Sequence, residues 1–137
     1  MKKIILHLGV HKTATTHIQS RLGNNQELYA KHGVGYVGLN ELRELLTSKL
    51  SHIFFNPKKV RSGFGTYEKF ETLIISDENI LGGTNMPLSN SLYQNINKRL
   101  YRVRDVFDDV EVIVNITLRD FSNYLLSRYS ESLRHFP

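Results

Sequence analysis

The segment from Ile4 to Gln19 constrains the fold of this chain more than any other part of the sequence. It begins with an apolar run, Ile4 to Leu8, which has the length of a buried strand and ends at a glycine. After a polar loop, Ile18 and Leu22 lie four residues apart, which is the spacing of one helical face. The order strand, loop, helix predicts the first unit of an α/β fold with a parallel sheet.

The rest of the chain continues this alternation. Further strands are predicted at Val34 to Val37, at Thr72 to Ile75 and at Val110 to Leu118, and the last of these is rich in β-branched residues and is expected in the core. Two apolar stripes at helical spacing lie between these runs. The first stripe, closed by Pro57, comprises Leu39, Leu42, Leu46, Leu50 and Ile53. The second, after the N-cap candidate Ser89, comprises Leu92, Ile96, Leu100, Val103 and Phe107.

These patterns predict an α/β domain of three layers, with a doubly wound, mostly parallel sheet and a P-loop-like phosphate-binding loop, covering residues 1–137 as a single domain. Lys58 to Thr66 mixes charge with glycine and serine and is predicted to be a loop. A last helix is predicted to carry Phe121, Leu125, Tyr129 and Leu133. Ligands of doubly wound folds bind beyond the carboxyl ends of the strands, so the residues that follow each strand are the candidates for a site.

Composition limits the kind of partner. The formal net charge of +5 favours anionic ligands, but the basic residues are scattered, so we expect a small anion or an acidic polymer and no nucleic acid. The chain has no cysteine, which excludes disulfides, thiolate metal sites and a cysteine nucleophile. No apolar stretch approaches the roughly 20 residues of a membrane span, and the cytoplasm is the default location. The sequence contains no signal for the oligomeric state.

The loop from Gly9 to Thr16, GVHKTATT, has the chemistry of an anion site. Gly9 permits a tight turn and Lys12 supplies a cation. Backbone N–H groups at the start of the following helix have no helical partner, and Thr13 and Thr15 are among the hydroxyl donors beside them. A Walker A loop would need glycine at position 14 and lysine at position 15, so an ordinary ATP or GTP site is disfavoured.

The order Lys-Thr-Ala-Thr-Thr resembles the K-T-G-T-T type loop with which PAPS-dependent sulfotransferases hold the 5′-phosphosulfate of their donor. The resemblance implies donor contacts by Gly9, His11, Lys12, Thr13, Ala14, Thr15 and Thr16, with Ala14 in place of the commoner glycine. A second stretch, RDFSNYLLSRY, resembles the 3′-phosphate site of the family. There Arg119 follows a strand and Ser127 comes about two helical turns later, although Phe121 stands where the family often has proline.

A third stretch, ISDEN, resembles the S-x-E-N sequence on the acceptor side of bacterial sulfotransferase-like proteins. The resemblance implies that Glu78 removes the proton of the acceptor and that Lys12 neutralises charge on the leaving phosphate. His11 and His17 are alternative bases, and His7 is expected to be a core or pocket-lining residue. No metal is expected, because no carboxylate completes a site beside these histidines.

Each candidate residue also has an ordinary structural interpretation. The threonines could cap the helix, Arg119 could pair with Asp120, and Glu78 could be a solvated loop carboxylate. Ser127 has a functional meaning only together with Arg119.

The function implied by the resemblance is transfer of a sulfonate group from PAPS to a hydroxyl or amine of a small-molecule or carbohydrate acceptor. The alternative is a non-catalytic module that binds PAP, PAPS or sulfated glycans, and a P-loop kinase is less favoured. Family members continue into a Gly- and Lys-rich segment that covers the donor. The chain is therefore expected to correspond to the N-terminal part of a longer family fold, or to a shortened member.

Overall fold

The computed structural model describes residues 1–9, 15–82, 93, 95–118, 120, 122–124, 126, 129 and 130. The strands are β1 (Lys3–Gly9), β2 (Val34–Tyr36), β3 (Thr72–Ser76) and β4 (Glu111–Thr117). The α-helices are α1 (Thr15–Asn24), α2 (Gln26–Ala30), α3 (Leu39–Leu45), α4 (Pro57–Ser62) and α5 (Ile96–Val106). Three 3-10 helices are η1 (Thr47–Ser51), η2 (Gly65–Tyr67) and η3 (Glu78–Leu81).

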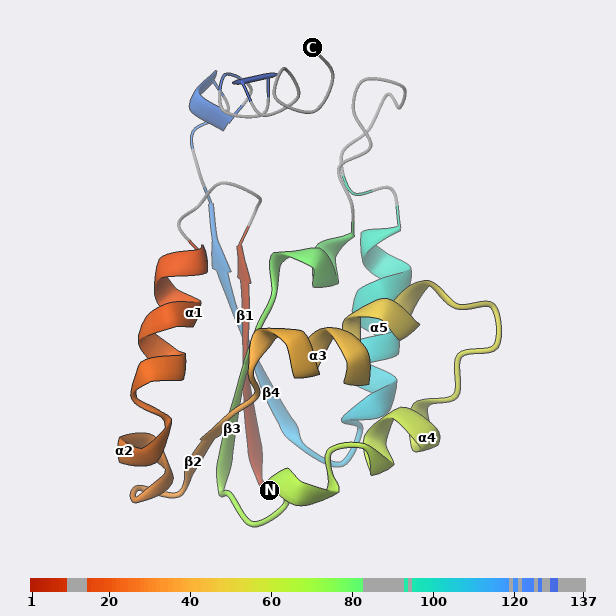
Figure 1. The fold of residues 1–137 in the computed structure, drawn as a ribbon. Coiled ribbons are helices and arrows are strands. Elements are labelled where there is room, and N and C mark those ends of the chain that lie inside the picture. Colours follow the sequence, from red (N-terminus) through yellow and green to blue (C-terminus); the bar gives the residue numbers. More distant parts are fainter. Residues whose placement is uncertain are drawn as a thin grey trace.

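The four strands form one parallel sheet in the order β2-β3-β1-β4 (Figure 1). β1 is internal: it pairs with β3 as far as His7↔Ser76 and with β4 as far as Gly9↔Thr117. Because all strands run in the same direction, their carboxyl ends meet at one edge of the sheet, which we call the carboxyl edge. The predicted parallel α/β fold is confirmed, and β3 lies between the two strands that come first in the sequence.

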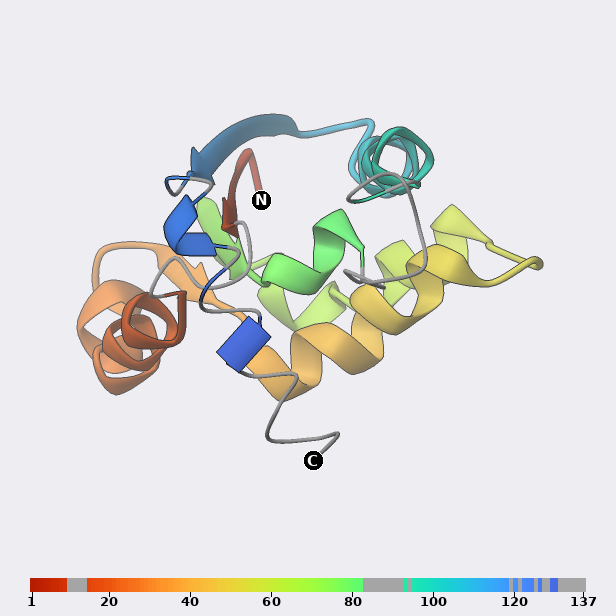
Figure 2. The same cartoon turned by 90° about the horizontal axis from the view of Figure 1, so that it is seen from above.

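Helices cover both faces of the sheet (Figure 1, Figure 2). α1 and α2 lie on one face, and α3, α4 and α5 lie on the other, which gives the predicted three layers. Central strands of such a sheet are covered on both sides and therefore have continuous apolar runs. The core between the sheet and the second helix layer includes the buried residues Ile4, Leu6, Leu8, Leu42, Leu46, Leu73, Ile75, Val103 and Phe107.

The first apolar stripe does not form one continuous helix. α3 ends at Leu45, and Leu46 leaves helical geometry with φ −128° and ψ −63° before the chain continues as η1. Leu42 and Leu50 are buried as predicted, but Ile53 is 88% exposed. The prediction is wrong for Ile53 because η1 ends at Ser51 and His52 is extended, with φ −67° and ψ 142°, so Ile53 lies in the turn that follows the helix.

Pro57 begins a helix instead of closing one. The side chain of Asn56 caps α4 by accepting a 3.0 Å hydrogen bond from the backbone N–H three residues later. Proline fits the first helical position because its missing N–H has no helical partner there. The predicted loop from Lys58 to Thr66 is therefore wrong, since most of it forms α4 and η2. Val60 and Phe64 are four residues apart and both buried, a helical signal hidden among charged residues and glycines.

The strand predicted in the core is the outer strand of the described sheet. β4 pairs with β1, and among the described residues no strand pairs with its other side. Ile113, Val114 and Ile116 are 42%, 49% and 51% exposed. The β-branched residues predict a strand correctly, but they are favoured at both the centre and the edge of a sheet. The prediction of a core position is therefore wrong.

The second apolar stripe forms α5 and its C-terminal end. Val103 and Phe107 are buried, and Ile96 and Leu100 are half-buried against the core, as predicted. Several positions of the predicted patterns lie outside the described residues: Ser89, Leu92, Phe121, Leu125 and Leu133.

Candidate functional site

Three predicted donor-binding residues flank the junction between β1 and α1. Gly9 is the last residue of β1 and is buried. Thr15 and Thr16 are the first residues of α1, and Thr15 is 5% exposed whereas Thr16 is exposed. The predicted order of strand, loop and helix is confirmed at both of its ends. The start of a helix that follows a strand in this way presents N–H groups suited to an anion.

Six predicted site residues lie outside the described part of the chain: His11, Lys12, Thr13, Ala14, Arg119 and Ser127. Their roles stay predictions. The strand ends that lead to two of these segments are described: they are Gly9 on β1 and Thr117 on β4. These two residues are register partners. The loop that begins at residue 10 and the segment that begins at residue 118 therefore leave the sheet from neighbouring positions.

His7 connects the ends of three strands. Its Nδ1 lies 2.8 Å from Oγ of Ser76 on β3, and its Nε2 lies 3.1 Å from Oγ1 of Thr117 on β4. Burial lowers the pKa of His7, and the negative charge of Glu78 opposes this shift only in part. A neutral imidazole has one N–H and one acceptor nitrogen, so one hydroxyl accepts a hydrogen bond from the ring and the other donates one to it. The expectation that His7 is a buried residue is confirmed.

Glu78, the predicted base, is the first residue of η3, just beyond the end of β3. Nε2 of Gln19 donates a 3.3 Å hydrogen bond to its carboxylate and a 3.2 Å hydrogen bond to the carbonyl of Ser76. Nη2 of Arg43, on α3, lies 3.5 Å from the other carboxylate oxygen, and the Glu78 side chain is 18% exposed. The carboxylate is therefore fixed in direction between an amide and a guanidinium at the carboxyl edge.

Asp77 holds the turn that places Glu78. Its fully buried side chain accepts a 3.1 Å hydrogen bond from the backbone N–H of Asn79. Arg43 donates two more, at 3.3 Å and 3.4 Å. A buried carboxylate is tolerated only where such partners replace water. Asp77 therefore has a structural role, and Arg43 links α3 to both acidic residues.

Arg99 joins α5 to the two 3-10 helices on the same face of the sheet. Its guanidinium donates to the carbonyls of Asn79 at 2.7 Å, Ile80 at 2.8 Å and Thr47 at 3.3 Å, and it also contacts the hydroxyl of Ser51. Burial lowers the pKa of Arg99, but the ordinary value for arginine is so high that the group stays charged. Its N–H groups are used by the protein itself, so Arg99 is a structural residue.

Three contributors to the site were not identified from the sequence: Gln19, Arg43 and Thr117. A signal for Gln19 was present, because it lies four residues after Thr15 and both are buried on one face of α1. Arg43 and Thr117 gave no local signal. Tertiary structure alone brings α3 and β4 to the carboxyl edge.

The site offers hydroxyl, amide, imidazole and carboxylate groups. Within the described residues, no group of three or more His, Cys, Asp or Glu side chains is arranged to hold a metal ion. The described groups can donate hydrogen bonds to a polar ligand and accept a proton from it.

Comparisons with protein-family models, with curated proteins and with solved structures find no match to this chain. No helix in the described ranges is both long enough and apolar enough to cross a membrane. The function is therefore inferred from the residues of the site and from their position on the sheet.

Proposed function

We propose that this chain binds PAPS at the carboxyl edge of the sheet and transfers its sulfonate group to a hydroxyl or amine of an acceptor. The main support is the register pairing of Gly9 with Thr117. The two segments that resemble donor-binding motifs, one beginning at residue 10 and the other containing Arg119, depart from these neighbouring strand ends. Ligands of doubly wound folds bind at this edge.

The donor is recognised through its two charged ends. The loop that contains Lys12 binds the 5′-phosphosulfate, and hydroxyls and N–H groups at the start of α1 add donors. Arg119 and Ser127 bind the 3′-phosphate. Because ADP and ATP lack this phosphate, Arg119 and Ser127 make the site selective for PAPS and PAP.

The transfer is an in-line displacement at sulfur. The acceptor oxygen or nitrogen forms a bond to sulfur while the bond from sulfur to the bridging phosphate oxygen breaks, and PAP leaves with the electron pair. Glu78 takes the proton of the acceptor, and Lys12 neutralises the charge that develops on the leaving oxygen. Gln19 and Arg43 hold the Glu78 carboxylate in a fixed direction during this step.

A non-catalytic module that binds PAP, PAPS or a sulfated glycan is the second candidate. One observation favours it: the Glu78 carboxylate already contacts Arg43 and Gln19, so part of its capacity to accept a proton is occupied before an acceptor arrives. A module that binds PAP or PAPS requires the same nucleotide site as the enzyme, and the two then differ only in whether sulfonate is transferred.

Calorimetric titration tests the nucleotide site. PAP, ADP and a short DNA duplex are titrated into the wild type, Lys12→Ala and Arg119→Ala, with Lys2→Ala as a control on an exposed lysine. PAP should bind selectively, and both site variants should weaken it by about tenfold or more, because each removes a charged hydrogen-bond donor to phosphate. Equal affinity for ADP and PAP would show that the site binds phosphate groups in general and does not recognise the 3′-phosphate.

A transfer assay then separates the two candidates. Sulfonate transfer from PAPS is measured over a panel of hydroxyl and amine acceptors with the wild type and Glu78→Gln. The variant keeps the size of the side chain, so PAP affinity should be unchanged while transfer falls by roughly 10²- to 10⁴-fold. Unchanged turnover would remove Glu78 as the base, and selective PAP binding without transfer to any acceptor would favour the module.

A further inference from the structure

A basic stretch without acidic residues lies between Glu44 and Glu68. Residues 45–67 contain no Asp or Glu, and their basic residues are Lys49, Lys58, Lys59 and Arg61. The stretch includes η1, α4 and the loop between them, which project from the molecule on the side opposite α1 (Figure 1, Figure 2). Arg61 forms ion pairs with Glu68 and Asp109, so the local positive charge of this part of the surface comes from the three lysines.

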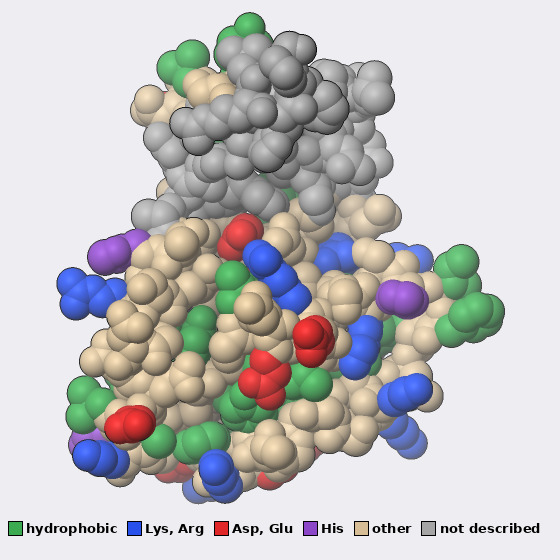
Figure 3. Space-filling view, in the orientation of Figure 1, with side chains coloured by type: hydrophobic (Ala, Val, Ile, Leu, Met, Phe, Trp, Pro, Cys, Tyr) green, Lys and Arg blue, Asp and Glu red, His purple; other side chains and the backbone are tan. Residues whose placement is uncertain are grey.

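Two large apolar side chains stand at the tip of the loop between η1 and α4. Ile53 is 88% exposed and Phe54 is 94% exposed. Figure 3 shows hydrophobic side chains projecting at this edge of the molecule, close to basic ones. Single exposed apolar residues are common on protein surfaces, but two adjacent ones on a projecting loop form a candidate contact for an apolar phase.

Arg102, on α5, fixes the base of this loop. Its Nη1 donates to the carbonyl of Leu50 at 2.8 Å and to the carbonyl of His52 at 2.9 Å. Its guanidinium also lies over the ring of Phe55, 4.7 Å from the ring centroid. Phe55 is thereby half-buried, whereas Ile53 and Phe54 before it are almost fully exposed. The loop therefore has a defined conformation in which the apolar tip is presented to the surroundings.

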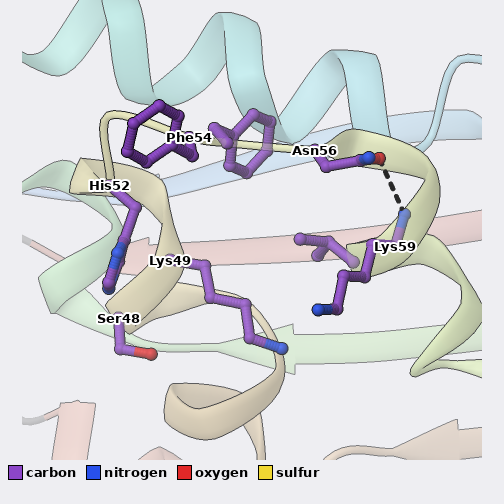
Figure 4. A pocket seen from close by; sticks show the side chains of 8 residues that line it. Ser48, Lys49, His52, Phe54, Asn56 and Lys59 are labelled. Carbon is purple, nitrogen blue, oxygen red and sulfur yellow. Dashed lines mark hydrogen bonds between the residues drawn. The ribbon is translucent and has the colours of Figure 1, made fainter.

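A cavity of about 290 Å³ opens beside the tip, between η1 and α4 (Figure 4). Its lining includes Lys49, His52, Phe54 and Lys59 and no carboxylate. In Figure 4 the side chains of Lys49 and Lys59 extend toward each other from the two helices. Across the described residues neither lysine takes part in an ion pair. Two like charges that face one opening are stabilised when an anion enters between them.

We propose that this surface docks on a lipid bilayer that contains anionic lipids. Ile53 and Phe54 insert at the boundary with the acyl chains, and Lys49 and Lys59 bind the phosphate of a headgroup. The apolar tip and the cationic cavity are adjacent, as the acyl and phosphate layers of a membrane are. A soluble anionic glycan would satisfy the lysines but would give Ile53 no apolar partner.

Vesicle sedimentation tests the proposal. The wild type is mixed with vesicles of phosphatidylcholine alone or of phosphatidylcholine with phosphatidylserine. Binding should be about tenfold tighter or more on the anionic vesicles, because each lysine near the surface adds roughly fivefold. The double variants Ile53→Ser/Phe54→Ser and Lys49→Ala/Lys59→Ala should each lose about tenfold or more of this binding.

Matched controls remove the same kinds of side chain elsewhere on the surface. Leu28→Ser changes an apolar residue that is 53% exposed on α2, and Lys31→Ala/Lys69→Ala removes two exposed lysines. Both controls should bind vesicles like the wild type, with unchanged circular dichroism spectra for every variant. The assay contains no nucleotide, so its result does not depend on the proposed sulfonate transfer.

Several results would overturn the proposal. Equal binding to neutral and anionic vesicles would do so, as would vesicle binding that neither double variant weakens. Retention on heparin that needs Lys49 and Lys59 but not Ile53 and Phe54, in the absence of vesicle binding, would assign the surface to a glycan. Binding of inorganic phosphate that needs Lys49 and Lys59, again without vesicle binding, would assign the cavity to a free anion.

Discussion

Nδ1 of His7 lies 2.8 Å from the hydroxyl oxygen of Ser76, although the two residues are 69 positions apart in the sequence. They are also register partners on β1 and β3. Since the other ring nitrogen contacts Thr117, one uncharged side chain joins three strands at the carboxyl edge. Protonation of the buried His7 imidazole should therefore disturb the carboxyl edge, where the proposed ligand binds.

Stability should depend on pH through His7. Burial places its folded-state pKa below the ordinary value of 6.5, so on acidification the unfolded chain takes up this proton first. The contribution of His7 to the free energy of unfolding should be largest above pH 6.5. It should fall as the pH is lowered from 6.5 to the folded-state pKa of His7. Urea denaturation at several pH values should show this dependence in the wild type and a flatter one in His7→Gln. The control His17→Gln, on the exposed side of α1, should keep the wild-type pH dependence of the free energy of unfolding. The same pH dependence in the wild type and in His7→Gln would contradict the prediction.

Arg99→Met should destabilise the fold by about 3 kcal/mol, because it leaves buried carbonyls on η1 and η3 without their donor. Arg104→Met is the control: this exposed residue on the same helix pairs only weakly with its neighbour Asp105, at 3.5 Å, and its loss should change stability by less than about 0.5 kcal/mol. Both values come from denaturant unfolding. Similar losses in the two variants would show that the hydrogen bonds of Arg99 contribute little.

Gly35→Ala should be unfavourable although Gly35 lies in an ordinary strand. A Cβ atom at this position would lie 2.5 Å from Cδ2 of Phe70, so the ring would have to move. We expect a loss of about 1–3 kcal/mol from this overpacking, measured by thermal or urea unfolding. Gly23→Ala, inside α1, places its Cβ where nothing lies within 4 Å and should not lower stability. A neutral Gly35→Ala would mean that Phe70 has free space to move into.

The same substitution should have very different effects on the central and outer strands. Ile75→Ala, on β3, empties a fully buried position and should cost about 2–5 kcal/mol. Ile113→Ala, on β4, removes a side chain that is already 42% exposed and should cost less than about 1 kcal/mol. Unfolding by urea compares the two. A large loss for Ile113→Ala would show that β4 is covered in solution by a surface that the described residues do not supply.

The elements that were predicted correctly are those whose pattern is set locally. Ile4 to Leu8 and Thr72 to Ile75 are short, mostly apolar runs, and both form central strands. The helix after the loop was also visible, because Ile18 and Leu22 keep helical spacing. Such a pattern predicts a strand or a helix without information about the neighbouring elements.

The features that were missed depend on contacts between distant segments. Nothing near Ile53 indicates that the helix before it changes to 3-10 geometry, and nothing in Val110 to Leu118 indicates that this strand is the outer one. The same applies to the candidate site: Glu78 is a candidate from its own sequence context, whereas Arg43 contacts it from α3, 35 residues earlier in the chain. Side chains that approach from another layer leave no trace in the local pattern.

The position of β1 inside the sheet also determines when the sheet can form. β1 is the first strand, but the side-chain partners of His7 are 69 and 110 residues away. A chain that emerges from the ribosome therefore carries β1 before either of its neighbouring strands has been made. Contacts over such separations are slow to form, and apolar strands that wait for them are open to wrong pairing. Folding of this chain is thus expected to be complete only when β4 has paired with β1. Exposure of β1 before its neighbouring strands are present should favour aggregation.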